Sequence, residues 1–436
     1  HTHTHTHTHE CADLPVSPLL LRENVDRIIA AIRARTPTAG VRRMSYLTEP
    51  CSMHDVVDET VGAKFPFVNR EEECKELLRT FHWVDRAARG KMMDKKMMAA
   101  ICVGSPGVGK SRFARAAVMH LVDDKVNSAY RYGGDAAHEP AAIACVANDI
   151  WSGTGLEKEA ENTLRDLVDA CKAGRNYCVD CDMNPAPSIL YQKVLHAHIS
   201  RATGVDTSVA SRALNEIAGI GRVSLRVVLE SLGIRPRTAT QEGDCVIINF
   251  DEAQVLSHET VVSILGEYRQ LVTEEHFRVF IIFTGLTMTN LVSAGKSSNF
   301  KLLPIVLPLL TNEDMTTIVL SLATRSGCSE IVPRIESGFK SVLFTQLLWW
   351  LGGNPRLLGQ FLIRVGDEGT IADTLRTLFD VVPTTTSRGK ALQYLLECLD
   401  HAAIDYFGAA PIDVSVLRGL ASLTLAEVEV PPWHQH

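Results

Sequence analysis

Short apolar runs alternate with longer amphipathic segments through the middle of the chain. Each run is hydrophobic throughout, which is typical of a strand buried on both faces of a sheet. The runs lie at 99–103, 245–250, 278–283 and 303–309. Helical periodicity follows two of them, over 110–122 and 258–273. Strands that alternate with helices predict an α/β fold, with a mainly parallel sheet between two layers of helices.

The segments between these runs are less regular. NSAYRYGG at 127–134 indicates a second strand. Helices are predicted at 18–35, 157–173, 187–202, 207–218 and 223–232, and beyond the sheet at 312–326, 335–351 and 354–365. The helices at 207–218 and 223–232 flank the sequence AGIGR. A helix-turn-helix is one interpretation, but helical packing within an insertion is the commoner explanation.

These patterns divide the chain into five parts. A low-complexity tail that begins HTHTHTHTHE is expected to be disordered. The parts are the tail (1–17), an N-terminal helix and connector (18–64), an α/β core (65–310) with a helical insertion at about 140–240, a helical segment (311–368), and a mostly helical C-terminal segment (369–436). An incomplete winged-helix-like domain is one interpretation of the last part.

Composition narrows the class of protein. Of 436 residues, 46% are hydrophobic and 22% charged, which is the profile of a globular protein rather than a disordered one. The net charge of −7 gives no overall attraction to nucleic acid or to an anionic membrane. No apolar run approaches the ~18 residues that a membrane-spanning helix needs, and no secretory signal is visible.

Eleven cysteines are scattered without a disulfide framework. Several lie inside apolar runs, which favours buried thiols and a reducing, intracellular compartment, either cytoplasmic or nuclear. Cys178 and Cys181 form a C-x-x-C, with Cys171 nearby. A zinc site would need a fourth ligand, for which His196 or His198 is available, but buried thiols remain the favoured explanation.

A glycine-rich loop follows the first apolar run. It matches G-x-x-x-x-G-K-[ST] through Gly104, Ser105, Pro106, Gly107, Val108, Gly109, Lys110 and Ser111, and Arg112 follows. Glycines let the backbone amides of such a loop approach a phosphate, and the next helix points its N-terminus at the anion. Lys110 would reach the β- and γ-phosphates of ATP, and the Ser111 hydroxyl would bind Mg²⁺. The strand before the loop and the helix after it favour a phosphate site over a structural turn.

A second run, CVIINFDEAQ at 245–254, ends in two acids. Asp251 would bind Mg²⁺ directly or through water, and Glu252 would orient the attacking water. Two adjacent carboxylates at the end of a buried strand are costly unless a cation pairs with them, so an ordinary turn is the poorer explanation. The pair therefore predicts hydrolysis of the nucleotide in addition to binding.

With these residues the chain resembles P-loop ATPases of the additional-strand, catalytic-glutamate class, and within it the AAA+ and STAND families. The resemblance implies sheet order 5-1-4-3-2 and a helical lid at 311–368. FPFVNRE at 65–71 is similar to the segment that packs near the adenine in those families, which implies nucleotide contacts for Val68, Asn69 and Arg70. Asn69 stands where those families usually have glycine, and it is also a candidate helix cap.

Two further segments resemble the same families. VFIIFTGL at 279–286 is similar to the sensor-1 strand and implies a place for Thr284 near the γ-phosphate. GGNPRLLGQFL at 352–362 is similar to the start of the lid helix and implies a sensor-2 role for Arg356. The combination of F-V-N-R-E, the glycine loop and D-E-A-Q is also similar to the NTPase domains of Crinkler effectors and of kinetoplastid retrotransposon-hot-spot proteins.

One departure concerns oligomeric motors. AAA+ rings insert an arginine into the neighbouring subunit's site from the region after sensor 1, but this sequence has no arginine between Arg278 and Arg325. A slow switch, in which bound nucleotide sets the position of the lid, fits better than a ring motor. Homo-oligomerisation stays open, and a protein partner is expected at the 140–240 insertion or the C-terminal segment.

Two alternatives remain open. One is a scaffold or effector protein that binds ATP with negligible turnover. The other is a nucleic-acid-stimulated translocase, suggested by the tetrad D-E-A-Q. Such translocases carry an arginine-rich motif downstream of the acids, whereas the pair Arg222 and Arg226 precedes them. Nucleic acid is therefore a weaker expectation than ATP and Mg²⁺.

Overall fold

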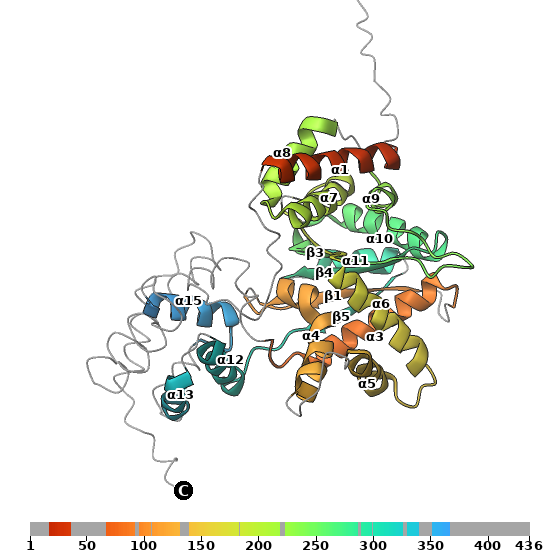
Figure 1. Cartoon of the computed structure of the whole chain (residues 1–436). Coiled ribbons are helices and arrows are strands. Elements are labelled where there is room, and N and C mark those ends of the chain that lie inside the picture. The colour runs from red at the N-terminus through yellow and green to blue at the C-terminus, as the bar shows by residue number, and fades with distance from the viewer. Residues whose placement is uncertain are drawn as a thin grey trace, which may run out of the picture. The chain divides into compact units, whose positions relative to one another are not determined.

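The computed structural model describes most of the central chain (Figure 1). The described residues are 17–35, 67–91, 96–105, 107–130, 139–182, 184–218, 223–286, 289–298, 300–325, 329–339 and 351–366. The predicted tail, most of the connector and the C-terminal segment 369–436 lie outside them.

The chain divides into two compact units. Within the described residues, the first unit holds 17–35, 70–104 and 110–307, and the second holds 67–69, 105–109 and 308–366. Each unit is described by itself below.

A parallel sheet of five strands forms the centre of the described part of the first unit. The strands are β1 (Met97–Val103), β2 (Asn176–Asp180), β3 (Cys245–Asp251), β4 (Arg278–Gly285) and β5 (Phe300–Val306). Their order is β2-β3-β4-β1-β5. This order equals the predicted 5-1-4-3-2 read from the other edge, so the predicted fold class is confirmed.

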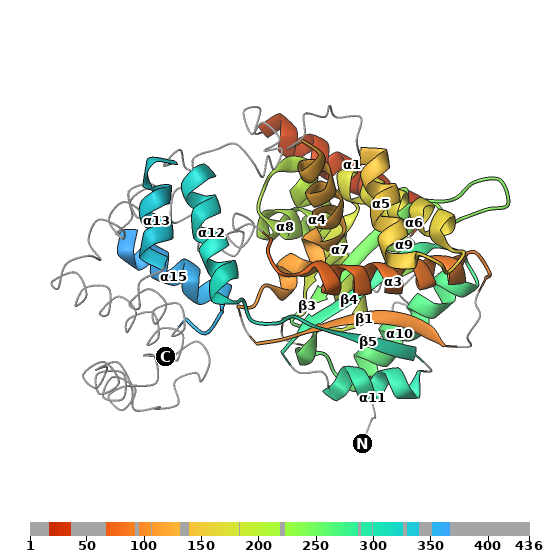
Figure 2. The ribbon, with the colours of Figure 1, turned by 90° about the horizontal axis from the view of Figure 1, so that it is seen from below.

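Helices cover both faces of this sheet. On one side lie α3 (Glu71–Ala88), α4 (Lys110–Tyr130), α5 (Glu139–Trp151) and α6 (Glu157–Lys172). On the other side lie α10 (His258–Thr273) and α11 (Thr289–Ser297), as Figure 2 shows. All residues of β4 are buried, because this strand is central and covered from both sides.

Four helices pack together beyond the β2 edge. They are α1 (Pro18–Arg35), α7 (Pro187–Thr203), α8 (Thr207–Ala218) and α9 (Leu225–Ser231). Proline in the first turn and Gly204 in the left-handed conformation (φ 72°) delimit α7. Arg33 of α1 donates to the carbonyl oxygen of Ala202 at 2.8 Å. The two short helices α8 and α9 thus pack on α1 and α7, and AGIGR is largely outside the described residues.

The second strand of the sheet differs from the predicted one. Residues 127–130 belong to α4, so the strand predicted there is wrong for the residues described. The strand next to β3 is instead β2, which lies inside the predicted insertion at 140–240. Side chains of α7 cover its outer edge: Arg201 donates to Asn176 O and Lys193 to Asp180 O, each at 2.7 Å. These bonds satisfy carbonyl groups that an edge strand would otherwise expose.

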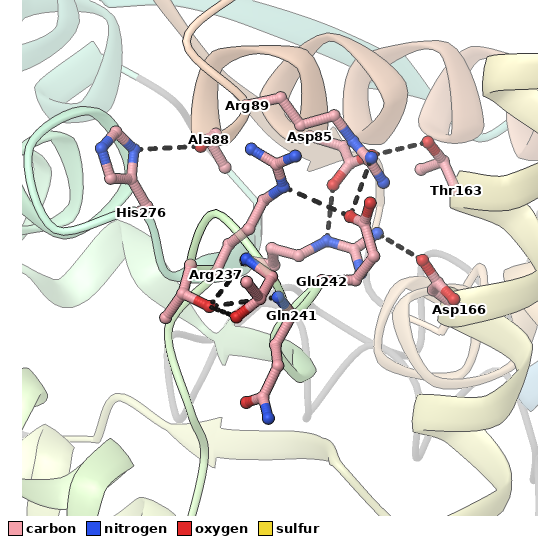
Figure 3. A network of polar contacts seen from close by, with 12 residues as sticks. Asp85, Ala88, Arg89, Thr163, Asp166, Arg237, Gln241, Glu242 and His276 are labelled. Carbon is pink, nitrogen blue, oxygen red and sulfur yellow. Dashed lines mark hydrogen bonds and ion pairs between the residues drawn. The ribbon is translucent and has the colours of Figure 1, made fainter.

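A charged network lies at the opposite end of the strands (Figure 3). Arg278, the first residue of β4, is 1% exposed and donates to Asp85 Oδ1 and Asp166 Oδ2, both at 2.7 Å. Asp85 also accepts from Thr163 Oγ1 at 2.7 Å and from Arg89 Nε at 2.9 Å. We call these five residues the Arg278 network; it ties α3 and α6 to the central strand β4.

Electrostatics within the Arg278 network favour the charged form of Asp85. Burial by itself would raise the pKa of this carboxyl group. The charges of Arg278 and Arg89 lower the pKa by more than burial raises it, so the net pKa lies below its ordinary value. The carboxylate is therefore paired and fully hydrogen-bonded, as a buried charge must be.

The described part of the second unit is helical. It contains α12 (Asn312–Arg325), the 3-10 helix η4 (Ser329–Ile331), α13 (Val332–Phe339) and α15 (Pro355–Gly366). Thr311 and Asp314 cap α12 reciprocally: Asp314 N donates to Thr311 Oγ1 at 3.1 Å, and Thr311 N donates to Asp314 Oδ2 at 2.8 Å. Among the described residues of both units, no helix combines the length and apolarity needed to cross a membrane.

Candidate functional site

The carboxyl ends of β1, β3 and β4 meet at one edge of the sheet. The parallel register pairs Cys102 with Thr284 and Phe250 with Phe283, so Asp251 is opposite Thr284. The glycine loop leaves β1 at this same edge. In open parallel sheets ligands bind outside the carboxyl ends of the strands. Within the first unit, the topology therefore brings the start of α4 and the predicted acids to the same end of the sheet.

Backbone conformation in the glycine loop agrees with the need for glycine. Gly107 (φ 80°) and Gly109 (φ 97°) lie in the left-handed region, where a side chain would be strained. Val108 N donates to Ser105 O at 3.4 Å and closes a turn. Pro106 is outside the described residues.

Within the second unit, Gly107 also lies against the start of α15. A Cβ atom at Gly107 would stand 2.6 Å from Asn354 Oδ1 and 2.7 Å from Arg356 Cβ. Asn354 caps α15, because its Oδ1 accepts from the backbone N–H of Arg356 at 2.9 Å. The structure thus places the predicted sensor-2 residue Arg356 in the first turn of α15, beside the tip of the loop, with its side chain exposed.

Lys110 opens α4 directly after the loop. It is 6% exposed, and its Nζ donates to the Gly104 carbonyl oxygen at 3.0 Å. Ser111 and Arg112, both half-buried, complete the first turn of α4. The N-terminal N–H groups and the dipole of this helix make its start a favourable place for an anion.

Asp251 ends β3 and is held from its neighbours. The Thr284 hydroxyl donates to Asp251 Oδ1, and the Glu252 backbone N–H donates to the same oxygen at 3.2 Å. Glu252 adopts the left-handed conformation (φ 54°, ψ 35°) and its side chain is exposed. This sharp turn separates the two carboxylates, with Asp251 kept against the sheet and Glu252 turned to solvent.

The buried thiol of Cys102 on β1 experiences the charges of three predicted site residues. Burial on β1 raises the pKa of this thiol to about 12. The positive charges of Lys110 and Arg70 act to lower it, and the negative charge of Asp251 acts to raise it. These three predicted site residues are thus within electrostatic reach of one buried sulfur atom.

The segment before α3 is divided between the units. Arg70 is 5% exposed and occupies the N-cap position of α3. The expectation that Asn69 caps this helix is therefore wrong. Asn69 has φ 50°, the left-handed conformation that glycine adopts easily, and its Nδ2 donates to Asp314 Oδ2 at 2.9 Å within the second unit. Val68, which precedes it, is half-buried.

A polar layer behind Asp251 was missed by the sequence analysis. Cys178 Sγ donates to Asp251 Oδ2 at 3.8 Å and accepts from Asn249 Nδ2 at 3.2 Å and from Arg115 at 3.3 Å. Burial raises the pKa of the Cys178 thiol, which keeps it a donor toward the carboxylate. The sequence did contain a signal for this layer. Residues two apart in a strand share a face, which places Cys178 with Asp180 in β2 and Asn249 with Asp251 in β3.

The residues of the first unit fit a nucleotide-bound magnesium ion better than a free metal ion. Among the described residues, no group of three or more His, Cys, Asp or Glu side chains could hold a metal. Mg²⁺ at nucleotide sites needs few protein ligands, because phosphate oxygens and water supply the rest. Asp251, oriented by the hydroxyl of Thr284, and Ser111 at the start of α4 are of the required chemical type.

Comparison with known proteins gives a distant likeness. No protein-family model and no curated protein matches the sequence. Among solved structures, Cdc6p from Pyrobaculum aerophilum is similar with 14% identity and a TM-score of 0.34, over 71% of this chain and 64% of that chain. The Orc1 protein from Aeropyrum pernix, solved in complex with DNA, is similar with 14% identity and a TM-score of 0.36, over 86% of this chain and 76% of that one. This chain spans less than two thirds of the length of that Cdc6p. Likeness at this level assigns no function, so the function must be argued from the chain's own residues.

Proposed function

We propose that this chain binds ATP with Mg²⁺ and hydrolyses it as a P-loop ATPase of AAA+ type, with bound nucleotide acting as a molecular switch. The observation that supports it most is the pair Asp251–Thr284 at the end of the central strands, in the same unit and at the same edge as Lys110. A purely structural glycine turn would not require an oriented acid there.

Each residue has a role in this proposal. The amides of 104–109 and Lys110 bind the phosphates, while Ser111 and Asp251 hold Mg²⁺, which neutralises phosphate charge. Glu252 orients the attacking water, and Thr284 keeps Asp251 in place. Arg112, Val68 and Arg70 are proposed nucleotide contacts, and Arg356 a residue that senses the γ-phosphate from the lid.

The finer assignments rest on sequence resemblance alone. These are the STAND type and the likeness to Crinkler and retrotransposon-hot-spot NTPase domains. An intracellular location is proposed on that likeness together with the buried free cysteines. A protein partner at 140–240 or in the C-terminal segment is part of the same proposal. DNA is a candidate partner because the similar Orc1 structure is a DNA complex, although the net charge of −7 gives this no support.

A second candidate function is ATP binding with negligible turnover. One contact favours it: Lys110 Nζ is engaged by the Gly104 carbonyl. This ammonium group must be redirected before it acts on phosphate. Such an arrangement suits a protein that is slow until a partner rearranges it.

Steady-state ATPase assays on wild type, Lys110→Ala and Glu252→Gln test the proposal. Turnover should be lost in both variants, while Glu252→Gln keeps its affinity for ATP, because it removes the water-orienting carboxylate and no phosphate contact. Nucleotide retained through purification without turnover would support the binding function instead. No turnover above Lys110→Ala and no retained nucleotide would refute both.

A further inference from the structure

Gln254 connects Glu252 to the end of β4. It lies in the short 3-10 helix η3 (Ala253–Val255), two residues after Glu252. Its Nε2 donates to Glu252 Oε2, and its Oε1 accepts from the backbone N–H of Leu286 at 3.0 Å. Leu286 directly follows β4. Both ends of the Gln254 amide are thus used, one on the predicted catalytic carboxylate and one on the sheet.

Space for this bridge depends on a glycine. A Cβ atom at Gly285 would collide with the side-chain oxygen of Gln254 and would stand 3.2 Å from its backbone nitrogen. Gly285 has no unusual backbone angle, so conformational freedom does not account for it. The close approach of Gln254 does.

The same short segment also controls Asp251. Thr284, two residues before Leu286, donates to Asp251 Oδ1. Residues 284–286 therefore contact one acid through a hydroxyl and the other through the Gln254 amide. A displacement of this segment would move both carboxylates together, whereas Glu252 without Gln254 would be an exposed side chain free to change rotamer.

We propose that Gln254 is a positioning residue for hydrolysis: it holds the Glu252 carboxylate in one orientation and couples it to the segment 284–286. The inference rests on the proposed ATPase function and adds to it a residue that touches neither phosphate nor metal. A general base must be within hydrogen-bond reach of its water, and misplacement by about 1 Å can cost about 100-fold in rate.

Gln254→Met tests this, because methionine keeps the length of the side chain and removes both hydrogen bonds. We expect kcat for ATP to fall at least tenfold, with KM and the dissociation constant of ATP within about twofold of wild type. Gln270→Met is the matched control. Gln270 on α10 makes the same kind of bond, from Nε2 to Glu275 Oε1 at 3.1 Å, away from the site, and its kcat should equal that of wild type.

A double-mutant cycle separates positioning from general structural damage. In the Glu252→Gln background, measured by single-turnover hydrolysis, Gln254→Met should have no further effect, because the carboxylate it positions is gone. Gln254→Glu, which keeps the acceptor for Leu286 but puts a like charge against Glu252, should also lose at least tenfold in kcat. Unfolding temperatures check that all variants are folded.

Failure of the positioning role of Gln254 can be told apart from failure of the proposed ATPase function. If wild type has no turnover above Lys110→Ala, the ATPase proposal fails. If wild type turns over and Gln254→Met matches it or exceeds it in kcat, or if Gln254→Met and Glu252→Gln add fully, the positioning role of Gln254 is refuted while the ATPase stands.

Discussion

Individual hydrogen bonds decide what the predicted acids can do. The Thr284 hydroxyl is fully buried and donates to Asp251, while Glu252 turns away through its left-handed backbone. Two neighbouring carboxylates thereby acquire different environments, one held by the Thr284 hydroxyl and one exposed to water. Such a division of roles is the usual result when adjacent acids are placed in different surroundings.

Thr284→Val removes that hydroxyl while keeping the shape of the side chain. A hydrogen bond to a charged group contributes about 1.5–3 kcal/mol, so the Mg²⁺ concentration for half-maximal ATPase activity should rise about tenfold or more. Titration of activity with Mg²⁺ measures this. Thr203→Val, which removes a buried hydroxyl bonded to the Ile199 carbonyl at 2.7 Å, should leave the titration unchanged; equal effects would contradict the role given to Thr284.

Gly107→Ala tests the loop. The left-handed backbone alone costs an L-residue about 1–2 kcal/mol, and a methyl group would also collide with Asn354 and Arg356. We expect ATP affinity, measured by calorimetry, to fall at least tenfold. Gly155 has a similar φ of 71° with nothing within 4 Å of an added Cβ, so Gly155→Ala should lower stability only. Unchanged affinity in Gly107→Ala would argue against phosphate binding by this loop.

At the scale of elements, the strands carry the predicted site residues of the first unit at one end and the Arg278 network at the other. Arg278 begins β4, and Thr284 lies near the end of the same strand. Because Asp85 belongs to α3 and Asp166 to α6, a single buried guanidinium group fixes two helices against the strand. The network thus sets the position of β4, on which the geometry of the predicted site depends.

Asp85→Asn should destabilise the protein by about 3 kcal/mol at neutral pH, the lower end of the cost of breaking a buried ion pair, because it removes the fully buried one of the two carboxylates that pair with Arg278. The folded-state pKa of Asp85 lies below its ordinary value of 3.8. The contribution of ionised Asp85 to the free energy of unfolding is therefore fully present above the ordinary pKa of 3.8. It is lost as the pH falls through the lower, folded-state pKa. Urea unfolding at pH 7 and at pH 3 measures this. The difference between wild type and Asp85→Asn should shrink at the lower pH; a constant difference would contradict it.

Much of this architecture could be predicted from sequence, and the exceptions have physical causes. The apolar strands β1, β3 and β4 were predicted, because strands buried on both faces are hydrophobic throughout. The sheet order was predicted from the resemblance to P-loop ATPases. The edge strand β2 was missed, since five residues with asparagine and aspartate at the ends give no such run. The strand expected at 127–134 was wrong because α4 continues to Tyr130. The ion pairs of Arg278 with Asp85 and Asp166, and the bond from Leu286 to Gln254, join residues distant in sequence and left no local pattern.

For the whole molecule, ligand binding should be measurable as stability. A ligand at 100 times its dissociation constant stabilises the folded state by about 2.7 kcal/mol if it does not bind the unfolded chain. ATP with Mg²⁺ should therefore raise the unfolding temperature of wild type, and Lys110→Ala or chelation of Mg²⁺ should abolish or reduce the increase. An equal increase in wild type and Lys110→Ala would mean that ATP binds elsewhere.

The chain passes from one compact unit to the other four times within the described residues, at 69–70, 104–105, 109–110 and 307–308. Cutting it at Leu307 would consequently not separate the two units cleanly. The fragment would retain the loop tip 105–109 and Asn69 but lose Asn354, Arg356 and Asp314, the groups that contact them. Because neither unit is one continuous stretch of sequence, no single cut can yield either of them intact.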